Sequence, residues 1–232
     1  MSHSAHSGFR RPDAPNTEAV EDYAKALHAL AKRCDGAVST SALAERLGVS
    51  PGSVTAMLKR MQEIGLVEHE RYRGALLTEE GERVALEVIR HHRLLESYLT
   101  DVLGMPWDRV HDEAEVLEHY ISEELEERIA EALGDPRHDP HGDPIPDREL
   151  ALKSEPGVPL AELEPGGMGT LARVSDSDPE MLRFLAERGI RPGSKLTVAE
   201  REPFGGSVSI EVEGRPHAIG ADLARRMVIA AG

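Results

Sequence analysis

The segment over residues 41–77 constrains the fold more than any other part of the sequence. A short helix predicted over residues 41–47 is stopped by Gly48, and a second helix starts at Ser50 with a proline in its first turn. Two short strand-like runs follow directly, over residues 66–77. Two short helices separated by three residues, with a β-hairpin behind them, indicate a winged helix-turn-helix.

The second of these helices has the pattern of a DNA-recognition helix. Small polar residues at its start can approach base edges, and cations one turn later can meet phosphates. The predicted hairpin wing adds two arginines. An ordinary helical hairpin that never contacts DNA is the alternative interpretation. The candidate DNA-binding residues are Ser50, Ser53, Thr55, Ala56, Lys59, Arg60, Arg71 and Arg73.

The distribution of charge along the chain agrees with a DNA-binding segment near the N-terminus. The net charge is −15, which by itself argues against a nucleic-acid partner. Residues 1–74, however, hold ten basic and nine acidic side chains, a sum of +1, so the remaining −16 belongs to residues 75–232. A near-neutral head on an acidic body is typical of a DNA-binding domain joined to a metal-binding one.

An unbroken helical pattern from about Asp108 to Gly134 carries the candidate metal ligands. At about 3.6 residues per turn, Glu115, Glu118 and His119 share one face. Carboxylates and an imidazole on one face suit a divalent metal such as Mn, Fe or Zn. The alternative is a solvated acidic helix, because residues 111–135 hold ten Asp/Glu and one Arg.

The regions on either side of this helix have a different character. A capped helix is predicted from Thr78 to about Leu103. Residues 134–157 are dense in Pro, Gly and Asp and have no helical period, so they are predicted to be loop and linker, with His138 and His141 solvated. Short β-type runs begin near Val158 and predict a small β-barrel domain.

Composition excludes other classes of protein. A single cysteine, Cys34, excludes an internal disulfide framework and fits a reducing cytosol. No apolar run approaches the length needed to cross a membrane. Residues 1–15 are polar, lack the apolar core of a signal peptide, and are predicted to be a disordered tail. We therefore expect a cytoplasmic protein with no membrane partner.

A specific order of short motifs runs from Thr17 to the C-terminus. The motifs are Glu21-Asp22-Tyr23, residues 49–55, Gly65-Leu66-Val67, residues 77–81, residues 90–96, residues 110–114, Glu118-His119 and residues 142–146. Together they resemble the diphtheria toxin repressor family of metal-dependent transcriptional regulators. The resemblance is to the long form with a C-terminal FeoA-type domain, and to its manganese-responsive branch.

The resemblance implies an α+β architecture in three parts. These are a winged helix-turn-helix domain over residues 16–77, a helical dimerisation and metal-binding domain over 78–150, and an SH3-like barrel over 158–232 after a linker at 151–157. It also implies two metal sites. The primary ligands fall on Asp22, Glu115, Glu118 and His119, the ancillary ligands on His92, Glu96 and His111, and Asp176 is a further candidate.

The same resemblance implies which metal binds. In iron-sensing members Met and Cys occupy the positions of Asp22 and Glu115, whereas this chain has carboxylates there, as in the manganese branch. Hard oxygen donors move the preference toward Mn(II). Lys25 stands where short manganese regulators have an acidic residue, which favours a separate ancillary site over a closely spaced metal pair.

The expected function is a Mn(II)-activated, homodimeric repressor of metal-uptake genes that binds a palindromic operator in double-stranded DNA. An Fe(II)-dependent repressor of the same family is the nearest alternative, and other divalent metals are expected to bind in vitro. A carboxylate-bridged metalloenzyme would repeat Glu-x-x-His on two helices, and no such pair occurs here. We therefore expect no enzymatic activity. A structural adaptor that binds a protein through the FeoA-like domain is the remaining alternative.

Overall fold

The computed structural model describes residues 17–32, 36–70, 73–153 and 156–231. They divide into two units: the first contains the described residues up to His91 together with His119–Glu127, and the second contains His92–Glu118 and the described residues from Arg128 onward. The predicted tail, Cys34 and Arg71 lie outside the described residues.

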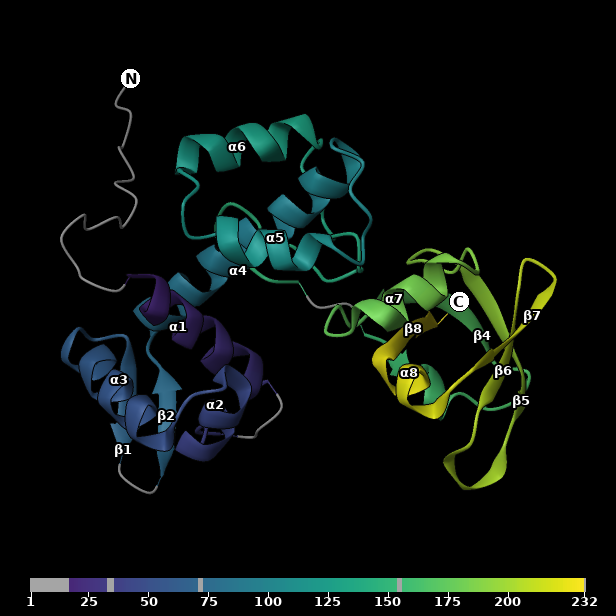
Figure 1. The fold of residues 1–232 in the computed structure, drawn as a ribbon, viewed down its shortest axis with the longest axis horizontal. Coiled ribbons are helices and arrows are strands. Elements are labelled where there is room, and N and C mark those ends of the chain that lie inside the picture. Colours follow the sequence, from purple (N-terminus) through teal and green to yellow (C-terminus); the bar gives the residue numbers. More distant parts are fainter. Residues whose placement is uncertain (1–16, 33–35, 71–72, 154–155, 232) are drawn as a thin grey trace. The chain divides into compact units, whose positions relative to one another are not determined.

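The first unit begins with the predicted winged helix-turn-helix (Figure 1), which the structure confirms. Ser39 Oγ accepts the backbone N–H of Ala42 at 3.1 Å to start the second helix, and Gly48 ends that helix with a left-handed φ of 65°. Ser50 Oγ caps the third helix at Ser53 N–H. The elements are α1 (Thr17–Ala31), α2 (Thr40–Leu47), α3 (Pro51–Glu63), β1 (Val67–Glu70) and β2 (Gly74–Leu77).

The wing is tied to the helices by backbone pairing and a shared core. β1 and β2 are antiparallel, and Val38 exchanges two 2.9 Å backbone hydrogen bonds with Ala75 on β2. Tyr23 and Leu27 of α1 belong to the same buried cluster as Leu58 of α3. Burial of this apolar surface makes α1 part of the winged helix-turn-helix fold.

A close backbone approach joins the wing to α4 (Glu79–Asp101), whose N-terminal part belongs to this unit. Thr78 Oγ1 accepts the N–H of Gly81 at 3.1 Å and donates to the Gly65 carbonyl at 2.8 Å. A Cβ at Gly81 would collide with the Leu66 carbonyl oxygen. The absence of a side chain at Gly81 therefore lets the helix start directly against the hairpin.

The prediction of one continuous helix from Asp108 to Gly134 is wrong. The structure has α5 (Val110–Leu117) and α6 (Glu123–Ala132), with turn and irregular backbone over residues 118–122. Ser122 starts the new helix, because its Oγ accepts the N–H of Leu125 at 3.3 Å, and Ile121 before it is buried. A serine that caps competes with helix continuation, which the apolar period alone did not reveal. Gly134 ends α6 with a φ of 74°, as predicted.

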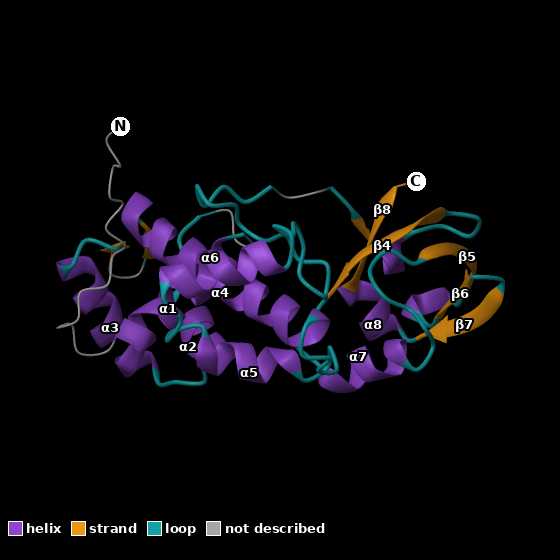
Figure 2. Ribbon diagram, turned by 90° about the horizontal axis from the view of Figure 1, so that it is seen from above, coloured by secondary structure: helices purple, strands orange, loops and turns teal. Residues whose placement is uncertain are grey.

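The C-terminal part of the second unit is an open antiparallel sheet in the order β3-β8-β4-β5-β6-β7 (Figure 2), so the predicted closed barrel is wrong. One edge strand has only two residues, and one of these is Pro159, which cannot donate a hydrogen bond for closure. Helices α7 and α8 contribute Leu185 and Leu223 to the core of the sheet. The elements are β3 (Val158–Pro159), η1 (Leu160–Glu162), β4 (Met168–Val174), α7 (Pro179–Ala186), β5 (Lys195–Arg201), η2 (Pro203–Gly205), β6 (Val208–Val212), β7 (Arg215–Ile219), α8 (Ala221–Arg226) and β8 (Met227–Ala231).

Several of these elements escaped the sequence analysis. The sequence pattern predicts strands over residues 169–174, 195–200, 207–212 and 227–230 and a helix over 179–188, which correspond to β4, β5, β6, β8 and α7, whereas β3, β7 and α8 were not predicted. None of the helices in the described part of the chain is both long and apolar enough to span a membrane.

We expect two glycine-to-alanine substitutions to change stability in opposite directions. Gly81→Ala should lower the free energy of unfolding by about 1–3 kcal/mol, because the added Cβ collides with a backbone carbonyl. The matched control, Gly52→Ala on α3, places its Cβ in ordinary van der Waals contact and should raise stability by about 0.5–1 kcal/mol. Urea unfolding of each variant measures both effects, and equal stability of the two variants would contradict the Gly81 contact.

Candidate metal and DNA-binding sites

The structure brings the three predicted ancillary ligands together in the second unit. His92 and Glu96 are one turn apart on α4, and His111 lies in the first turn of α5. His92 Nε2 lies 3.0 Å from Glu96 Oε1 and 3.2 Å from His111 Nδ1, and His111 Nδ1 lies 3.2 Å from Glu96 Oε1. His92 and Glu96 are buried, so this is an enclosed cluster of one carboxylate and two imidazoles.

Asp176 joins this cluster from the loop between β4 and α7. Its Oδ2 lies 3.3 Å from His111 Nδ1. Asp178, two residues later, serves a different purpose, because its carboxylate caps α7 by accepting the N–H of Glu180 at 3.0 Å. The C-terminal domain therefore contributes a carboxylate to the cluster, as the sequence analysis considered for Asp176.

Two further ligand-type residues, Asp139 and His141, lie beside Glu96 and were not predicted. Both are buried, so the expectation that His141 is solvated is wrong. His141 Nδ1 lies 3.5 Å from Glu96 Oε2, and its Nε2 lies 2.8 Å from the Trp107 carbonyl oxygen. The only signal in the sequence was an Asp and a His two positions apart in a loop rich in Pro and Gly.

Local backbone contacts hold this loop in place. Asp139 Oδ1 accepts the backbone N–H groups of His141 and Asp143, each at 2.9 Å. Val174 N–H donates to the His141 carbonyl at 2.9 Å, and Gly142 lies so close to the Ala172 carbonyl that a Cβ would not fit. The loop is thereby bonded to β4, the strand that leads to Asp176.

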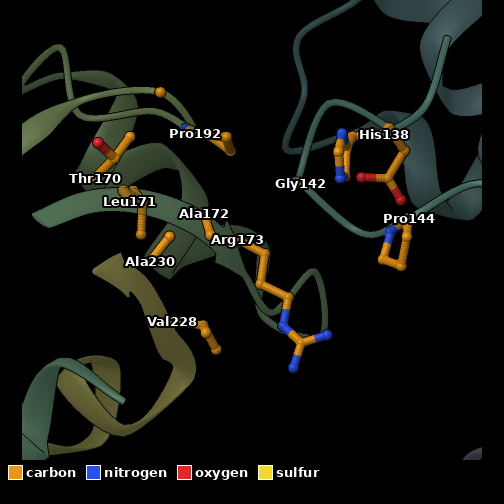
Figure 3. A pocket seen from close by; sticks show the side chains of 12 residues that line it. His138, Gly142, Pro144, Thr170, Leu171, Ala172, Arg173, Pro192, Val228 and Ala230 are labelled. Carbon is orange, nitrogen blue, oxygen red and sulfur yellow. The ribbon is translucent and has the colours of Figure 1, made fainter. Parts of the chain in front are cut away.

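Arg93 braces the same loop from α4. Its guanidinium donates to the Pro144 carbonyl and lies 3.7 Å from Asp139 and 3.8 Å from Asp143. A cavity of about 260 Å³ remains between the loop and β4, with His138 and Pro144 on the loop side and Arg173 on the strand side (Figure 3).

The cluster is electrostatically coupled through Glu96. Burial opposes ionisation of Glu96, but the imidazoles of His92, His111 and His141 hold the pKa of this carboxyl well below its usual range. Hydrogen bonds to Asp176 and Glu96 raise the pKa of His111 to about 10. Burial raises the pKa of Asp139 to about 8. Protonated imidazoles thus offset the carboxylate charge, and a divalent cation would take over that role by displacing protons.

His92 also contacts the predicted primary ligands of this unit. Its Nδ1 lies 2.5 Å from Glu118 Oε2 and 3.8 Å from Glu115 Oε1. Glu118 is buried, whereas the side chain of Glu115 is 43% exposed. One imidazole therefore touches carboxylates of both predicted metal sites, one through each ring nitrogen.

The other two predicted primary ligands lie in the first unit. Asp22 on α1 and His119 in the turn before α6 approach each other, with 3.2 Å between Asp22 Oδ1 and His119 Nε2. Glu21, which was not predicted as a site residue, lies 2.6 Å from His119 Nδ1 through its Oε2. The four predicted primary ligands are thus divided equally between the two units.

The chemistry of these groups fits a divalent metal. In the second unit, three sets of residues can each offer one ligand atom per residue within 4.8 Å of one another. All of their donors are carboxylate oxygens or imidazole nitrogens, which Mn(II), Fe(II) and Zn(II) accept. The sets are His92, Glu96, His111 and Asp176; His92, Glu115 and Glu118; and Glu96, Asp139 and His141.

The described candidate DNA-binding residues lie at the start and along the outer side of α3 and, for Arg73, in the turn of the wing. Ser53, Thr55, Ala56 and Lys59 are exposed, whereas Val54, Leu58 and Met61 on the same helix are buried. The side chains of Lys59 and Arg73 are 77% and 80% exposed; Lys59 lies 3.8 Å from Glu63 and Arg73 lies 3.2 Å from Glu70, and both glutamates are exposed. Ion pairs of this kind are weak, so both cations can exchange them for phosphates.

Three family models match successive parts of the chain. They are the N-terminal DNA-binding domain of iron-dependent repressors over residues 16–75, the metal-binding and dimerisation domain of the same repressors over residues 78–147, and the FeoA domain over residues 158–231.

Individual proteins give the same result. The iron-dependent repressor IdeR of Mycobacterium tuberculosis is 35% identical over 184 residues, covering 74% of this chain and 79% of that protein. The transcriptional regulator MntR of Escherichia coli O157:H7 is 38% identical over 118 residues, covering 50% of this chain and 75% of that protein. A solved manganese-dependent transcriptional repressor in complex with manganese superposes with a TM-score of 0.85 and 40% identity, covering 92% of this chain and all of that one.

These matches cover the DNA-reading helices, the cluster around Glu96 and the C-terminal sheet alike. The chain therefore belongs to the diphtheria toxin repressor family of metal-dependent, DNA-binding transcriptional repressors.

Proposed function

We propose that this chain is a Mn(II)-activated, homodimeric repressor that binds a palindromic operator and controls metal-uptake genes. The observation that carries the choice of metal is the donor chemistry. In the described residues, the ligand groups around Glu96 and His119 are carboxylates and imidazoles, with no cysteine among them. Oxygen donors suit Mn(II), whereas thiolate and thioether donors favour softer metals.

Two predicted primary ligands support this choice most directly. Asp22 and Glu115 are carboxylates at positions where the iron-sensing members, by resemblance, have Met and Cys. Asp139 and Asp176 add further oxygen donors beside the ancillary ligands. An Fe(II)-dependent repressor is the second candidate, and the relation to the mycobacterial iron-dependent repressor favours it.

The proposed switch follows from the division of the primary ligands. Asp22 and His119 belong to one unit, and Glu115 and Glu118 to the other. A metal ion that binds all four restricts the motion of the units relative to each other. Raising the population of the DNA-competent state from about 1% to about 99% requires the metal to bind this state about 5.5 kcal/mol more tightly than the other state. Several ligand bonds that form in only one state are an adequate source of this energy.

Exposed apolar side chains support a dimer formed through the helical domain. In the second unit, Leu103 just after α4 and Val116 and Leu117 on α5 are 58%, 62% and 38% exposed. Exposed large apolar groups of this kind are typical of a protein interface. A two-fold dimer presents two copies of α3 to successive major-groove half-sites, which favours a palindromic operator.

We expect Mn(II) to activate DNA binding at concentrations at which Fe(II) activates it only weakly. Anaerobic fluorescence anisotropy on a promoter-derived palindrome, titrated with each metal, measures this. Glu115→Cys replaces a hard donor with a thiolate and should reduce the preference for Mn(II), and Glu113→Cys on the same helix is the control. Equal responses of the wild-type chain to both metals would contradict the argument from donor hardness, and binding without any metal would contradict the switch.

We expect Mn(II) to stabilise the chain through Glu96. At a free Mn(II) concentration of about 100 times Kd, the folded state gains about 2.7 kcal/mol, which raises Tm. Glu96→Gln should lose the part of this gain that comes from the ancillary site and keep the part from the primary site, because both oxygens of Glu96 face imidazoles that the ancillary metal would share. Glu164→Gln, at a side chain that is 82% exposed, is the control and should keep the full shift. A full shift in Glu96→Gln would exclude Glu96 as a ligand.

We expect the cations of α3 to contribute phosphate contacts. The Lys59→Ala, Arg60→Ala double variant should bind the operator more weakly, and the magnitude of the slope of log K against log salt concentration should fall by about 2 per protomer, or about 4 for the dimer. The control is Lys195→Ala with Arg215→Ala, which removes two exposed cations of the second unit. An unchanged salt slope in the α3 variant would favour the adaptor interpretation over DNA binding through this helix.

A further inference from the structure

Glu21 and Asp22, two consecutive residues of α1, contact opposite sides of one imidazole. His119 Nδ1 lies 2.6 Å from Glu21 Oε2, and His119 Nε2 lies 3.2 Å from Asp22 Oδ1. The His119 side chain is 7% exposed, and the Glu21 side chain is 27% exposed. The contact at Nδ1 is therefore short and largely shielded from water, which strengthens a hydrogen bond to a charged acceptor.

We infer that Glu21 is a positioning residue that orients His119 so that Nε2 binds the metal. The inference rests on the proposed function, in which Asp22 and His119 are Mn(II) ligands. An ionised carboxylate only accepts hydrogen bonds, so the hydrogen of this contact resides on Nδ1 of His119. Asp22 is also only an acceptor, so a hydrogen on Nε2 is directed at Asp22 and a cation that binds Nε2 displaces it. Because the Nδ1 hydrogen is kept by Glu21, Nε2 is the ring nitrogen that donates its lone pair to the cation.

The geometry separates this role from that of a ligand. The Glu21 oxygen is held at Nδ1, on the side of the ring away from Nε2. A metal ion on Nε2 therefore cannot share that oxygen while the hydrogen bond is kept. A carboxylate behind a metal-binding imidazole fixes its tautomer, restricts its rotation and raises its basicity. Removing such a partner typically weakens metal binding by about 10- to 100-fold.

Glu18 supplies a matched comparison on the same helix. It lies one turn before Glu21 and accepts a 2.6 Å hydrogen bond from Tyr120 Oη, the residue after His119. Both glutamates thus attach α1 to the same turn, but only Glu21 touches the imidazole. A purely structural role of these contacts would be common to both residues, whereas an orienting role belongs to Glu21 alone.

The first measurement is Mn(II) affinity of the full chain by isothermal titration calorimetry. We expect Glu21→Ala to weaken the site that contains His119 by about 10- to 100-fold. Glu21→Gln should weaken it less, because its amide oxygen still accepts from Nδ1–H. Glu18→Gln should stay within about twofold of wild type, since its contact leaves the ring unchanged.

The second measurement reports on the ring itself without any metal. Nitrogen-15 shifts of the histidine rings distinguish the two tautomers, and His119→Gln identifies the His119 signals. We expect Nδ1 to carry a hydrogen in wild type and in Glu21→Gln, and Glu21→Ala to shift toward the form with its hydrogen on Nε2 alone. A structural change alone would lower affinity without this change of tautomer.

The inference is overturned if Glu21→Ala binds Mn(II) as wild type does, or if its affinity falls while the ring shifts of His119 stay the same. It is also overturned if Glu18→Gln loses as much affinity as Glu21→Ala. A different result would contradict the proposed function: equal Mn(II) binding by Asp22→Ala and wild type, whatever the Glu21 variants do.

Discussion

The buried carboxylate of Glu96 is the interaction on which the second unit depends. A carboxylate in an apolar interior is costly unless it is paired, and here imidazoles meet both of its oxygens. His92 comes from its own helix, His111 from α5 and His141 from the proline-rich loop. The need to pair one charge thus gathers three segments, and Asp176 on His111 brings in a fourth from the C-terminal domain. A site held this firmly is organised before any metal arrives, so the cost of ordering it on binding is low.

His92 gives the two predicted metal sites a common member. Its Nε2 faces Glu96 and His111, and its Nδ1 faces Glu118. Because the two nitrogens belong to one rigid ring, a rotation of the His92 ring that changes its contact with one carboxylate also changes its contact with the other. The loop with His141 is coupled in the same way, since His141 stacks on Trp107, a residue of the C-terminal core, at a centroid distance of 5.6 Å. Metal binding at the proposed ancillary site would therefore be linked to the packing of the C-terminal domain within this unit.

Local signals were sufficient for much of the fold. Ser50 and Gly48 marked helix boundaries correctly because capping and left-handed turns are properties of a few adjacent residues. The cap at Thr78 marked the start of α4 for the same reason. The break between α5 and α6 was missed, because the helical period continues through residues 118–122 and only the cap at Ser122 opposes it. The open edge of the sheet was also missed, since closure depends on strands far apart in the sequence.

The sequence by itself determined the order of the domains, the DNA-reading helix and the ligand chemistry, because helix periods, caps and residue types are written locally. Only the tertiary structure decided that His141 and Asp139 are buried beside Glu96 and that Asp176 faces His111. It also decided that Glu21 lies behind the imidazole of His119, ninety-eight residues away in the chain. The physical reason is common to these cases. Residues in loops and turns have no periodicity, so their partners are selected by long-range backbone contacts and by the pairing of buried charge.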